Sequence, residues 1–323
     1  MKIPVTDCRW LYALACVIAP LYTHAADVWP SRPLRMVVPF APGGSGDVIA
    51  RPMADRLTRV LGKQVVVDNR TGAGGMIGIN LAATAAPDGH TLLLTSNSLA
   101  TSAAVQKTPY DPLRDFDAIG RIAAAPLLVV RRANLPVKGL PELLAYAKAN
   151  PGKLSYGTAG IGSSQHLIGE LFAMTAGVKV EMIHYKGTAP SLIDLIGGRI
   201  DMVITTMASI RGTGGAERLP RLAFATAKRN NADPDVPTLR ETGVDLVAGQ
   251  WWGLFAPRGL AVGLRDRVNR EIVSATADPA FTKLLDALAA MPAPSTPREL
   301  QELLAFEVKR WAVTAASAGV RVQ

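Results

Sequence analysis

Two glycine-rich segments hold the residue types best suited to binding a small ligand. The first, residues 43–47, reads GGSGD and follows an apolar, partly β-branched run at 34–38. Apolar side chains then recur at helical spacing over 48–61, so we expect a strand, a tight turn and a helix with Asp47 as its N-cap. The first N–H groups of a helix lack partners within it and lie at the positive end of its dipole. The segment therefore predicts a site for an anion, either phosphate or carboxylate; a tight turn without a ligand is the alternative.

The same order of features recurs about 120 residues later. A strand expected over 154–157 leads into TAGIGSSQH at 158–166, and a helix is expected over 167–176. Because both segments join a strand to a helix start, each can present unpaired backbone N–H groups. We therefore expect the two segments to face each other across a cleft, one from each of two lobes.

Neither segment matches a motif for nucleotide binding or hydrolysis. No Gly-Lys-Ser/Thr follows the first segment, and Ile49 stands where a dinucleotide fingerprint has its third glycine. In the second segment, Ser163 and Ser164 precede His166, but the second glycine of a Gly-x-Ser-x-Gly elbow is missing. A secreted serine and histidine hydrolase is kept as a minor alternative, which catalytic turnover would reveal.

The first 25 residues differ in kind from the remainder of the chain. Lys2 and Arg9 make a basic start, and the apolar run at 10–21 is too short to span a bilayer comfortably. Small residues follow, so we interpret residues 1–25 as a secretory signal peptide that is cut near Ala25 or Ala26. This predicts an exported protein.

Composition excludes several classes of function. Both cysteines, Cys8 and Cys16, lie in the leader, so the mature chain should have no disulfide, thiolate nucleophile or cysteine-ligated metal. No His-x-x-x-His or His-Glu-x-x-His pattern is present, and we expect no metal and no cofactor. The 35 basic and 26 acidic residues are scattered and only 6% of residues are aromatic, which argues against nucleic acid and favours anionic ligands mildly. No later apolar run reaches transmembrane length.

Strands and helices alternate along the chain, which predicts an α/β fold with mostly parallel sheets flanked by helices. The Asp-Gly-His turn suggests an exposed His90, and Thr296 with Glu299 has capping-box spacing. Trp251 and Trp252 could form an aromatic wall for a ligand, but we favour a strand with one tryptophan in the core and one at the lobe boundary. The expected strands lie at 34–38, 65–68, 91–95, 116–131, 154–157, 178–185, 200–205, 221–226 and 250–256, and the expected helices at 48–61, 77–86, 141–147, 167–176, 186–196, 264–277, 279–289 and 297–318.

An ordered set of short motifs covers essentially the whole mature chain. The sequence resembles the Bug (TctC-like) receptors, the extracytoplasmic solute-binding components of tripartite tricarboxylate transporters. No motif is strong alone, but their shared order is specific. The motifs are WPSRP (29–33), VPFAPGG (38–44), VDNR (67–70), GAGG (72–75), APDG (86–89), PYDP (109–112), YG (156–157), SQHL (164–167), YKG (185–187) and FAP (255–257).

The resemblance implies a two-lobed, type II periplasmic binding fold that closes on its ligand. Lobe one would comprise 26–129 and 251–323 and lobe two 130–250, with hinges near 129–131 and 249–253. Such a receptor is a monomer and not an enzyme, and it presents a small carboxylate to a membrane permease or a sensor. Dicarboxylates, tricarboxylates, acidic amino acids and aromatic acids all stay open. A scaffold that has lost ligand binding is a further alternative.

The resemblance also implies that backbone N–H groups and ordered water hold the carboxylate. Two departures from the family pattern stand out: Gly46 replaces a threonine, and the segment 205–218 is unusual and contains Arg211. Arg211 could pair with a second carboxylate, but an exposed arginine at a helix end is the favoured interpretation. The ligand-binding residues implied are Phe40, Gly43, Gly44, Gly46 and Asp47 in lobe one, and Thr158, Gly160, Gly162, Ser163, Ser164 and His166, with Lys186, Gly187 and Thr188 nearby, in lobe two.

Overall fold

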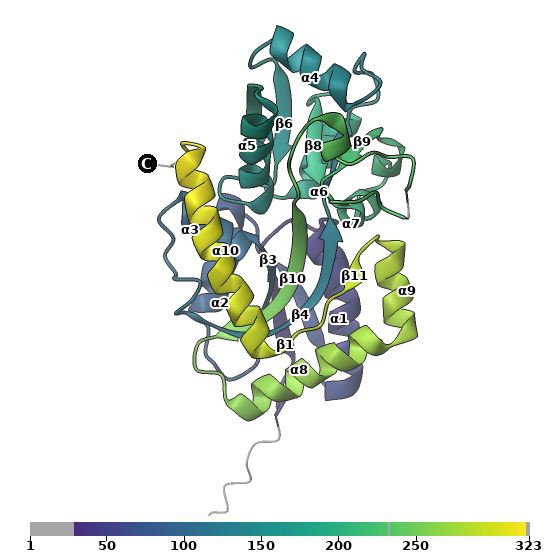
Figure 1. Ribbon diagram of the computed structural model, residues 1–323. Coiled ribbons are helices and arrows are strands. Elements are labelled where there is room, and N and C mark those ends of the chain that lie inside the picture. The colour runs from purple at the N-terminus through teal and green to yellow at the C-terminus, as the bar shows by residue number, and fades with distance from the viewer. Residues whose placement is uncertain (1–28, 232, 321–323) are drawn as a thin grey trace, which may run out of the picture.

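The computed structural model describes residues 29–231 and 233–320, so the expected signal peptide at 1–25 lies outside the described residues. Two β-sheets lie one beyond the other in Figure 1, and helices flank both. We call the six-stranded sheet with its helices the first lobe and the five-stranded sheet with its helices the second lobe. The predicted two-lobed α/β fold is therefore confirmed.

The first lobe has the strand order β11-β4-β10-β3-β1-β2. β1 pairs in parallel with β2 and β3, whereas β10 runs antiparallel to both β3 and β4. The elements are β1 (Leu34–Val38), α1 (Ser45–Leu61), β2 (Val65–Asn69), α2 (Met76–Ala83), β3 (Thr91–Ser96), α3 (Ser98–Val105), β4 (Phe116–Pro126), β10 (Gly249–Pro257), α8 (Val262–Ala277), α9 (Pro279–Ala287), β11 (Met291–Pro292) and α10 (Pro297–Ser317), with a short 3-10 turn, η1, at Ala73–Gly75.

The second lobe has the strand order β7-β6-β8-β5-β9. β6 is parallel to β7 and β8, whereas β5 is antiparallel to β8 and β9. The elements are β5 (Leu128–Arg131), α4 (Leu140–Ala149), β6 (Leu154–Thr158), α5 (Ser164–Ala176), β7 (Val180–His184), α6 (Thr188–Ile196), β8 (Met202–Thr205), α7 (Met207–Gly212) and β9 (Arg221–Phe224), with 3-10 turns η2 (Ala216–Arg218) and η3 (Arg240–Thr242).

The chain passes between the lobes on two strand connections. The expectation of one strand over 116–131 is wrong: β4 ends at Pro126 in the first sheet, and β5 begins at Leu128 in the second. The return path enters β10 at Gly249, beside β4. Because β10 runs back along β4, and β5 runs against β8, antiparallel pairs occur in both sheets. The sheets are therefore mixed, which corrects the expectation that they are mostly parallel.

Local expectations are confirmed in part. The capping box is present, because the Thr296 hydroxyl accepts from the Glu299 N–H and the Glu299 carboxylate accepts from the Thr296 N–H. Asp47 is not the N-cap of α1: the cap is Gly44, and Asp47 lies in the first turn. The strand expected at 91–95 runs to Ser96, and α3 begins at Ser98.

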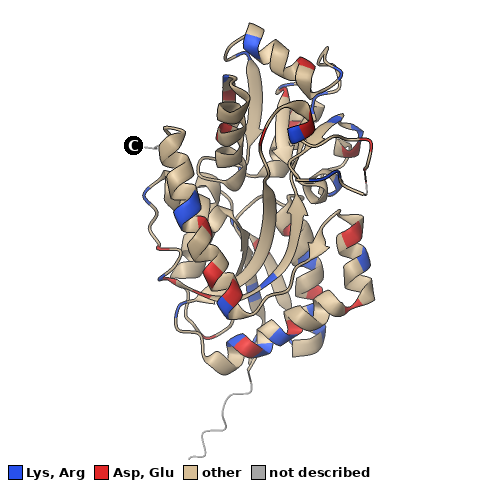
Figure 2. Cartoon of the chain, in the orientation of Figure 1, with Lys and Arg blue, Asp and Glu red and all other residues tan. Residues whose placement is uncertain are grey.

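Charge and hydrophobic burial are distributed over both lobes. Figure 2 shows Lys and Arg interspersed with Asp and Glu, as the scattered sequence pattern predicts. Large side chains such as Phe116, Tyr156 and Trp311 are fully buried in one cluster that draws on both sheets. Over residues 29–231 and 233–320, no helix is long and apolar enough to cross a membrane.

Candidate functional site

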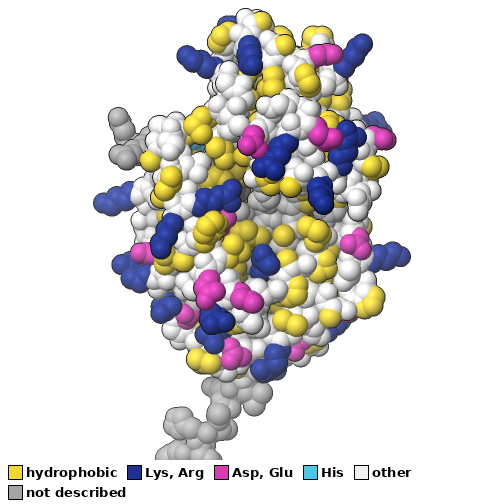
Figure 3. All heavy atoms as spheres, in the orientation of Figure 1, with side chains coloured by type: hydrophobic (Ala, Val, Ile, Leu, Met, Phe, Trp, Pro, Cys, Tyr) yellow, Lys and Arg dark blue, Asp and Glu magenta, His cyan; other side chains and the backbone are white. Residues whose placement is uncertain are grey.

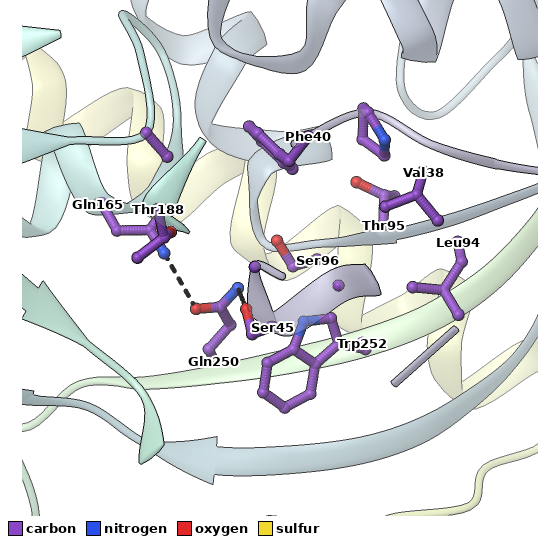
Figure 4. A pocket seen from close by; sticks show the side chains of 14 residues that line it. Val38, Phe40, Ser45, Leu94, Thr95, Ser96, Gln165, Thr188, Gln250 and Trp252 are labelled. Atoms are coloured by element: carbon purple, nitrogen blue, oxygen red, sulfur yellow. Dashed lines mark hydrogen bonds between the residues drawn. The ribbon is translucent and has the colours of Figure 1, made fainter. Parts of the chain in front are cut away.

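The starts of α1 and α6 and the first turn of α5 converge where the two lobes meet, and they enclose a small cavity (Figure 4). The cavity has a volume of about 20 Å³, which holds little more than one water molecule. The carboxyl ends of β1 and β3 and the hinge strand β10 supply the rest of its wall. The lining residues are Val38, Pro39, Phe40, Gly44, Ser45, Gly46, Leu94, Thr95, Ser96, Ala159, Gln165, Thr188, Gln250 and Trp252.

Glycine allows the lobes to touch backbone to backbone around this cavity. A Cβ atom added to Gly43, whose φ is 79°, would lie 2.9 Å from the Gly212 carbonyl oxygen of the second lobe. A Cβ atom on Gly74 would lie only 1.8 Å from the Ile161 carbonyl oxygen. No side chain fits at such distances, so glycine at these positions is a requirement of lobe closure.

Hydrogen bonds between the lobes hold the closed arrangement together. The N–H of Ser45, in the first turn of α1, donates to the Ser209 hydroxyl in the second lobe. One helix-start donor of the first lobe is thereby satisfied by the second lobe. The bonds are Ser45 N–H to Ser209 Oγ (3.1 Å), Ala41 N–H to Lys186 O (3.2 Å), Thr101 Oγ1 to Gly162 O (2.8 Å) and Ser164 N–H to Ser98 Oγ (3.2 Å).

Inside the cavity, a chain of amides and hydroxyls spans the cleft. Gln165 from α5 donates through Nε2 to Gln250 Oε1 at 3.3 Å, and Gln250 Nε2 donates to Ser45 Oγ at 3.5 Å, as the dashed lines in Figure 4 show. Gln250 lies on the hinge strand β10, so it contacts both lobes. These long bonds are weak, and a ligand that offers better acceptors can replace them.

Two further polar groups of the lining have no partner. Among the described residues, Thr95 Oγ1 and Trp252 Nε1 are buried without a hydrogen bond. A buried polar atom left unpaired costs on the order of 1–3 kcal/mol, and native structures usually satisfy such atoms with protein, water or ligand. The cavity therefore offers an unused indole N–H donor and an unused hydroxyl to a polar occupant.

The structure divides the fourteen sequence-predicted residues into two groups. Four line the cavity: Phe40, Gly44, Gly46 and Thr188. The other ten lie around it: Gly43, Asp47, Thr158, Gly160, Gly162, Ser163, Ser164, His166, Lys186 and Gly187.

Most of the ten surrounding residues hold the two turns in place. Asp47 accepts from the Gly43 N–H at 3.1 Å and pairs with Arg51 at 2.8 Å. The Ser163 hydroxyl caps α5 by accepting from the His166 N–H at 3.2 Å. Thr158 accepts from the Gly160 N–H at 3.0 Å, which shapes the start of the second turn. A Cβ atom on Gly187 would lie 2.9 Å from the Ala41 nitrogen, so this residue also belongs to the lobe contact.

His166 supports the second turn and remains neutral. Its Nδ1 accepts from the Gly162 N–H at 3.2 Å, and its ring lies 5.0 Å from that of His184, nearly perpendicular to it. Burial, and secondarily the neighbouring His184, lower the pKa of His166 to about 4. Although Nε2 is 3.7 Å from a Glu170 oxygen, burial raises the pKa of that carboxyl group, so the contact is not a strong ion pair.

The hydrolase alternative finds no geometric support in the described part of the chain. The Ser163 hydroxyl bonds the backbone of His166, and the Ser164 hydroxyl donates to Gln165 Oε1 at 3.1 Å. Neither serine hydroxyl bonds the imidazole, so no activated nucleophile is assembled. The same ranges, 29–231 and 233–320, hold no group of three or more His, Cys, Asp and Glu residues arranged to bind a metal.

Several lining residues were missed by sequence reasoning. Ser45, Thr95, Ser96, Ala159, Gln165 and Gln250 were not proposed as ligand contacts. The signal for Thr95 and Ser96 was present, because polar residues at the carboxyl end of a parallel strand commonly line ligand sites. Gln250 had no comparable signal, since its place in the cavity depends on the path of β10 between the lobes.

Four residues singled out in the sequence take different places around the site. Trp252 is fully buried and also lines the cavity, whereas Trp251 is 5% exposed. Arg211 is exposed at the end of α7, outside the lining, which agrees with its favoured interpretation. The expected exposure of His90 is wrong: it is 7% exposed, because the Trp29 ring packs edge-on against it.

A small cavity with several polar side chains between two closed α/β lobes defines the class of solute-binding proteins that enclose their ligand. Comparison with known proteins gives the particular family. A family model described as the tripartite tricarboxylate transporter family receptor matches residues 49–319. The chain belongs to this receptor family, and it is a solute-binding receptor rather than an enzyme.

Individual relatives agree with this assignment along nearly their whole length. Protein BugT of Bordetella pertussis is 36% identical over 315 residues, which cover 96% of each chain. The periplasmic binding protein BugD matches with a TM-score of 0.87 at 35% identity, over 91% of this chain and 100% of that chain. An R. palustris protein solved with adipate gives a TM-score of 0.86 at 33% identity, over 90% and 98% of the two chains. MatC of Rhodopseudomonas palustris, solved with bound malate, gives 0.83 at 29% identity, over 88% and 99%.

Proposed function

We propose that this receptor binds a small carboxylate in the cavity between its lobes and presents it to the membrane permease of a tripartite tricarboxylate transporter, or to a sensor. The observation that carries the proposal is the pair of unpartnered groups, Thr95 Oγ1 and Trp252 Nε1, in a cavity formed by helix starts from both lobes. The cavity is enclosed, and helix starts and hydrogen-bond donors line it, whereas no charged side chain does. Such an arrangement of donors favours an anion over a neutral solute. The adipate and malate held by two relatives support a carboxylate.

The size of the cavity constrains how the ligand enters. About 20 Å³ is too small for a dicarboxylate, so the lobes must part and the Gln165 to Gln250 bond must break during binding. The two amides are then free to turn their N–H groups toward the carboxylate oxygens. We propose that Phe40, Gly44, Gly46 and Thr188 contact the ligand directly, and that His166 and the other surrounding residues hold the turns.

Cellular placement is part of the same proposal. We propose that residues 1–25 direct export to the periplasm and are removed near Ala25 or Ala26, and that the mature receptor acts as a monomer. N-terminal sequencing of the exported protein and light scattering of the purified protein test these two points. A retained leader, or a stable dimer, would overturn the respective statement.

The test of binding is a thermal-shift screen of the mature protein against C3 to C6 mono-, di- and tricarboxylates, aromatic acids, amino acids and nucleotides, followed by calorimetry. A ligand present at a hundredfold excess over its Kd stabilises the native state by about 2.7 kcal/mol. We expect shifts with a subset of carboxylates, including malate or adipate, and recovery of the ligand unchanged. Shifts with nucleotides alone would contradict the carboxylate proposal, and no shift at all would favour a scaffold that has lost binding.

A matched pair of glycine variants separates cavity binding from general effects. Gly46 is the second residue of α1 and lines the cavity, whereas Gly263 is the second residue of α8, and no atom lies within 4 Å of a Cβ atom added there. Gly46→Leu should fill the cavity and abolish the carboxylate shift, and Gly263→Leu should leave it intact. Equal binding by both variants would place the ligand elsewhere.

A further inference from the structure

A second and much larger hollow lies on the other face of the hinge strands. Its volume is about 1030 Å³. Trp252 lines the small cavity, whereas its neighbour Trp251 lines this groove, as expected for successive strand residues that point to opposite faces. Figure 3 shows a hollow between the lobes on this face, with hydrophobic side chains around it and Lys and Arg near its edge. We call it the hinge groove.

Both lobes contribute walls to the hinge groove. Residues 225–231, which follow β9, form the wall of the second lobe. Asp286 of α9 and residues 289–291, which lead into β11, form the facing wall of the first lobe together with α10. The ends of β4 and β10 lie between them. Because the two walls belong to different lobes, the width of the groove depends on the angle between the lobes.

The surface of the groove is largely apolar. Alanine, proline and valine residues of the strand ends line it, and Met291 and Val247 lie at its edge with 60% and 40% exposure. Trp251 is 5% exposed, and its Nε1 is buried without a partner among the described residues. An apolar hollow of this size with a few polar groups is typical of a small-molecule site.

Some charged side chains that line the groove have ion-pair partners, and others do not. Buried Glu307 accepts from Trp311 Nε1 and Asn97 Nδ2 and lies 3.4 Å from Arg310, so both charges of that pair are engaged. Arg229 is paired with Glu241 at 2.9 Å.

Two cationic side chains and one anionic side chain of the groove lining make no ion pair in the described part of the chain. The Arg121 guanidinium donates through Nε to the Ala293 carbonyl oxygen at 2.9 Å; it makes no ion pair over the described residues, although its charge helps to lower the pKa of Glu299. Lys228 is exposed and has no ion pair in the described part of the chain. Asp286 is exposed on the opposite wall. The unpaired charge is therefore positive, which favours an anionic ligand.

We propose that the hinge groove, which shares the lining residue Gln250 with the cavity, is a second ligand site for a monocarboxylate with an apolar body. The hydrocarbon part would cover the apolar strand ends and Met291, and the carboxylate would lie toward Lys228 and Arg121. A ligand that touches both walls binds best at one lobe angle, so its binding is coupled to cavity closure. Opening the cavity about β4 and β10 narrows the groove on the opposite face. A ligand that fills the groove keeps its walls apart and therefore favours the closed receptor.

The test uses octanoate as the probe and isothermal titration calorimetry on the mature wild-type protein and four variants. Gly46→Leu fills the cavity and therefore isolates the groove. Met291→Glu and Lys228→Glu place negative charge on the apolar rim and at the free cation. Lys63→Glu makes the same charge change outside the groove lining and serves as the matched control. Urea denaturation of each variant verifies that it folds.

We expect octanoate to bind both wild type and Gly46→Leu, but more weakly in the variant, because a leucine side chain exceeds the cavity volume of about 20 Å³ and parts the lobes, which narrows the groove. Lys228→Glu should weaken binding by about fivefold, the scale of one exposed ion pair, and Met291→Glu should weaken it further. Lys63→Glu should not differ from wild type. In wild type, saturation with whichever of malate and adipate binds the cavity should tighten octanoate binding by roughly fivefold or more.

Three results would overturn the proposal. The first is a failure of octanoate to bind wild type at millimolar concentration. The second is binding that vanishes in Gly46→Leu and persists in Lys228→Glu and Met291→Glu, which would assign octanoate to the cavity. The third is octanoate binding that all four variants retain unchanged, which would place octanoate outside both the cavity and the groove. Each of these outcomes leaves the cavity proposal standing, because that proposal is tested separately by the thermal-shift screen of C3 to C6 carboxylates and by the glycine variants.

Discussion

Replacing Gly74 with alanine should block lobe closure and leave the fold intact. Gly74 has φ 63°, so an alanine there costs about 1–2 kcal/mol of backbone strain whether the lobes are open or closed. The added Cβ would also lie 1.8 Å from the Ile161 carbonyl oxygen, and this contact exists only when the lobes are closed. A normal contact needs more than 3 Å, so the lobes must part by more than 1 Å at this point.

The expected loss of affinity follows from the neighbouring bonds. Such a gap breaks the Thr101 to Gly162 bond of 2.8 Å and the Ser98 to Ser164 bonds beside it. Two or three hydrogen bonds at about 1 kcal/mol each correspond to roughly 2–3 kcal/mol, which is about a 30- to 150-fold increase in the Kd of the carboxylate. Calorimetry measures the affinity, and small-angle scattering measures whether the ligand still compacts the protein.

Gly62→Ala is the matched control for this prediction. Gly62 has φ 69° at the C-cap of α1, and no atom lies within 4 Å of its added Cβ. Both variants should lose similar stability in urea, but only Gly74→Ala should lose affinity. If Gly74→Ala binds as tightly as Gly62→Ala, closure does not depend on this contact and the reasoning fails.

Three further predictions concern single side chains of the site. The pKa of His166 is lowered to about 4, so the unfolded chain binds more protons than the folded one between about pH 4 and 6.5. The free energy of unfolding should therefore rise with pH across this window and fall on acidification, by about 3 kcal/mol at most. His166→Gln should flatten this slope in urea titrations. Trp252→Phe removes the unpartnered N–H and should weaken carboxylate binding roughly fivefold in calorimetry without loss of stability, whereas Trp251→Phe should leave it unchanged; equal effects would mean that the indole N–H does not reach the ligand. Arg211→Ala should leave dicarboxylate affinity unaltered, because Arg211 is exposed outside the lining, and a loss of about tenfold would instead support a second carboxylate contact.

Much of the local architecture was predictable from short-range pattern. The glycine turns after β1 and β6, and the helices that follow them, were each expected from apolar spacing and turn residues. Errors arose where the local pattern is ambiguous. Residues 116–131 are largely apolar, and Pro126 is a break signal in the run, since proline cannot donate to a strand ladder; it does not tell that the chain there leaves one sheet for the other.

The sequence did not separate the turn residues that line the cavity from those that support the turns, because this difference depends on where each side chain points. Asp47 and His166 both lie beside the cavity, but one pairs with Arg51 and the other accepts from the backbone of Gly162. Sequence spacing places a residue on a turn, but it does not say whether the side chain folds back onto its own turn, as both of these do, or points into the cavity. For this reason the residues near the site were found, but the lining and the supporting set were not separated.

By itself, the sequence determined the alternation of strands and helices, the two glycine turns that open helices, and the family motifs. These are local properties, fixed by backbone sterics and by hydrophobic spacing within a few residues. Only the tertiary structure decided which groups meet in the cavity. Gln165 and Gln250 are separated by 85 residues, and Ser45 and Gln250 by 205, so their contact depends on the docking of two lobes. The same docking left Trp252 Nε1 unpaired and opened the hinge groove, because both are consequences of the lobe angle.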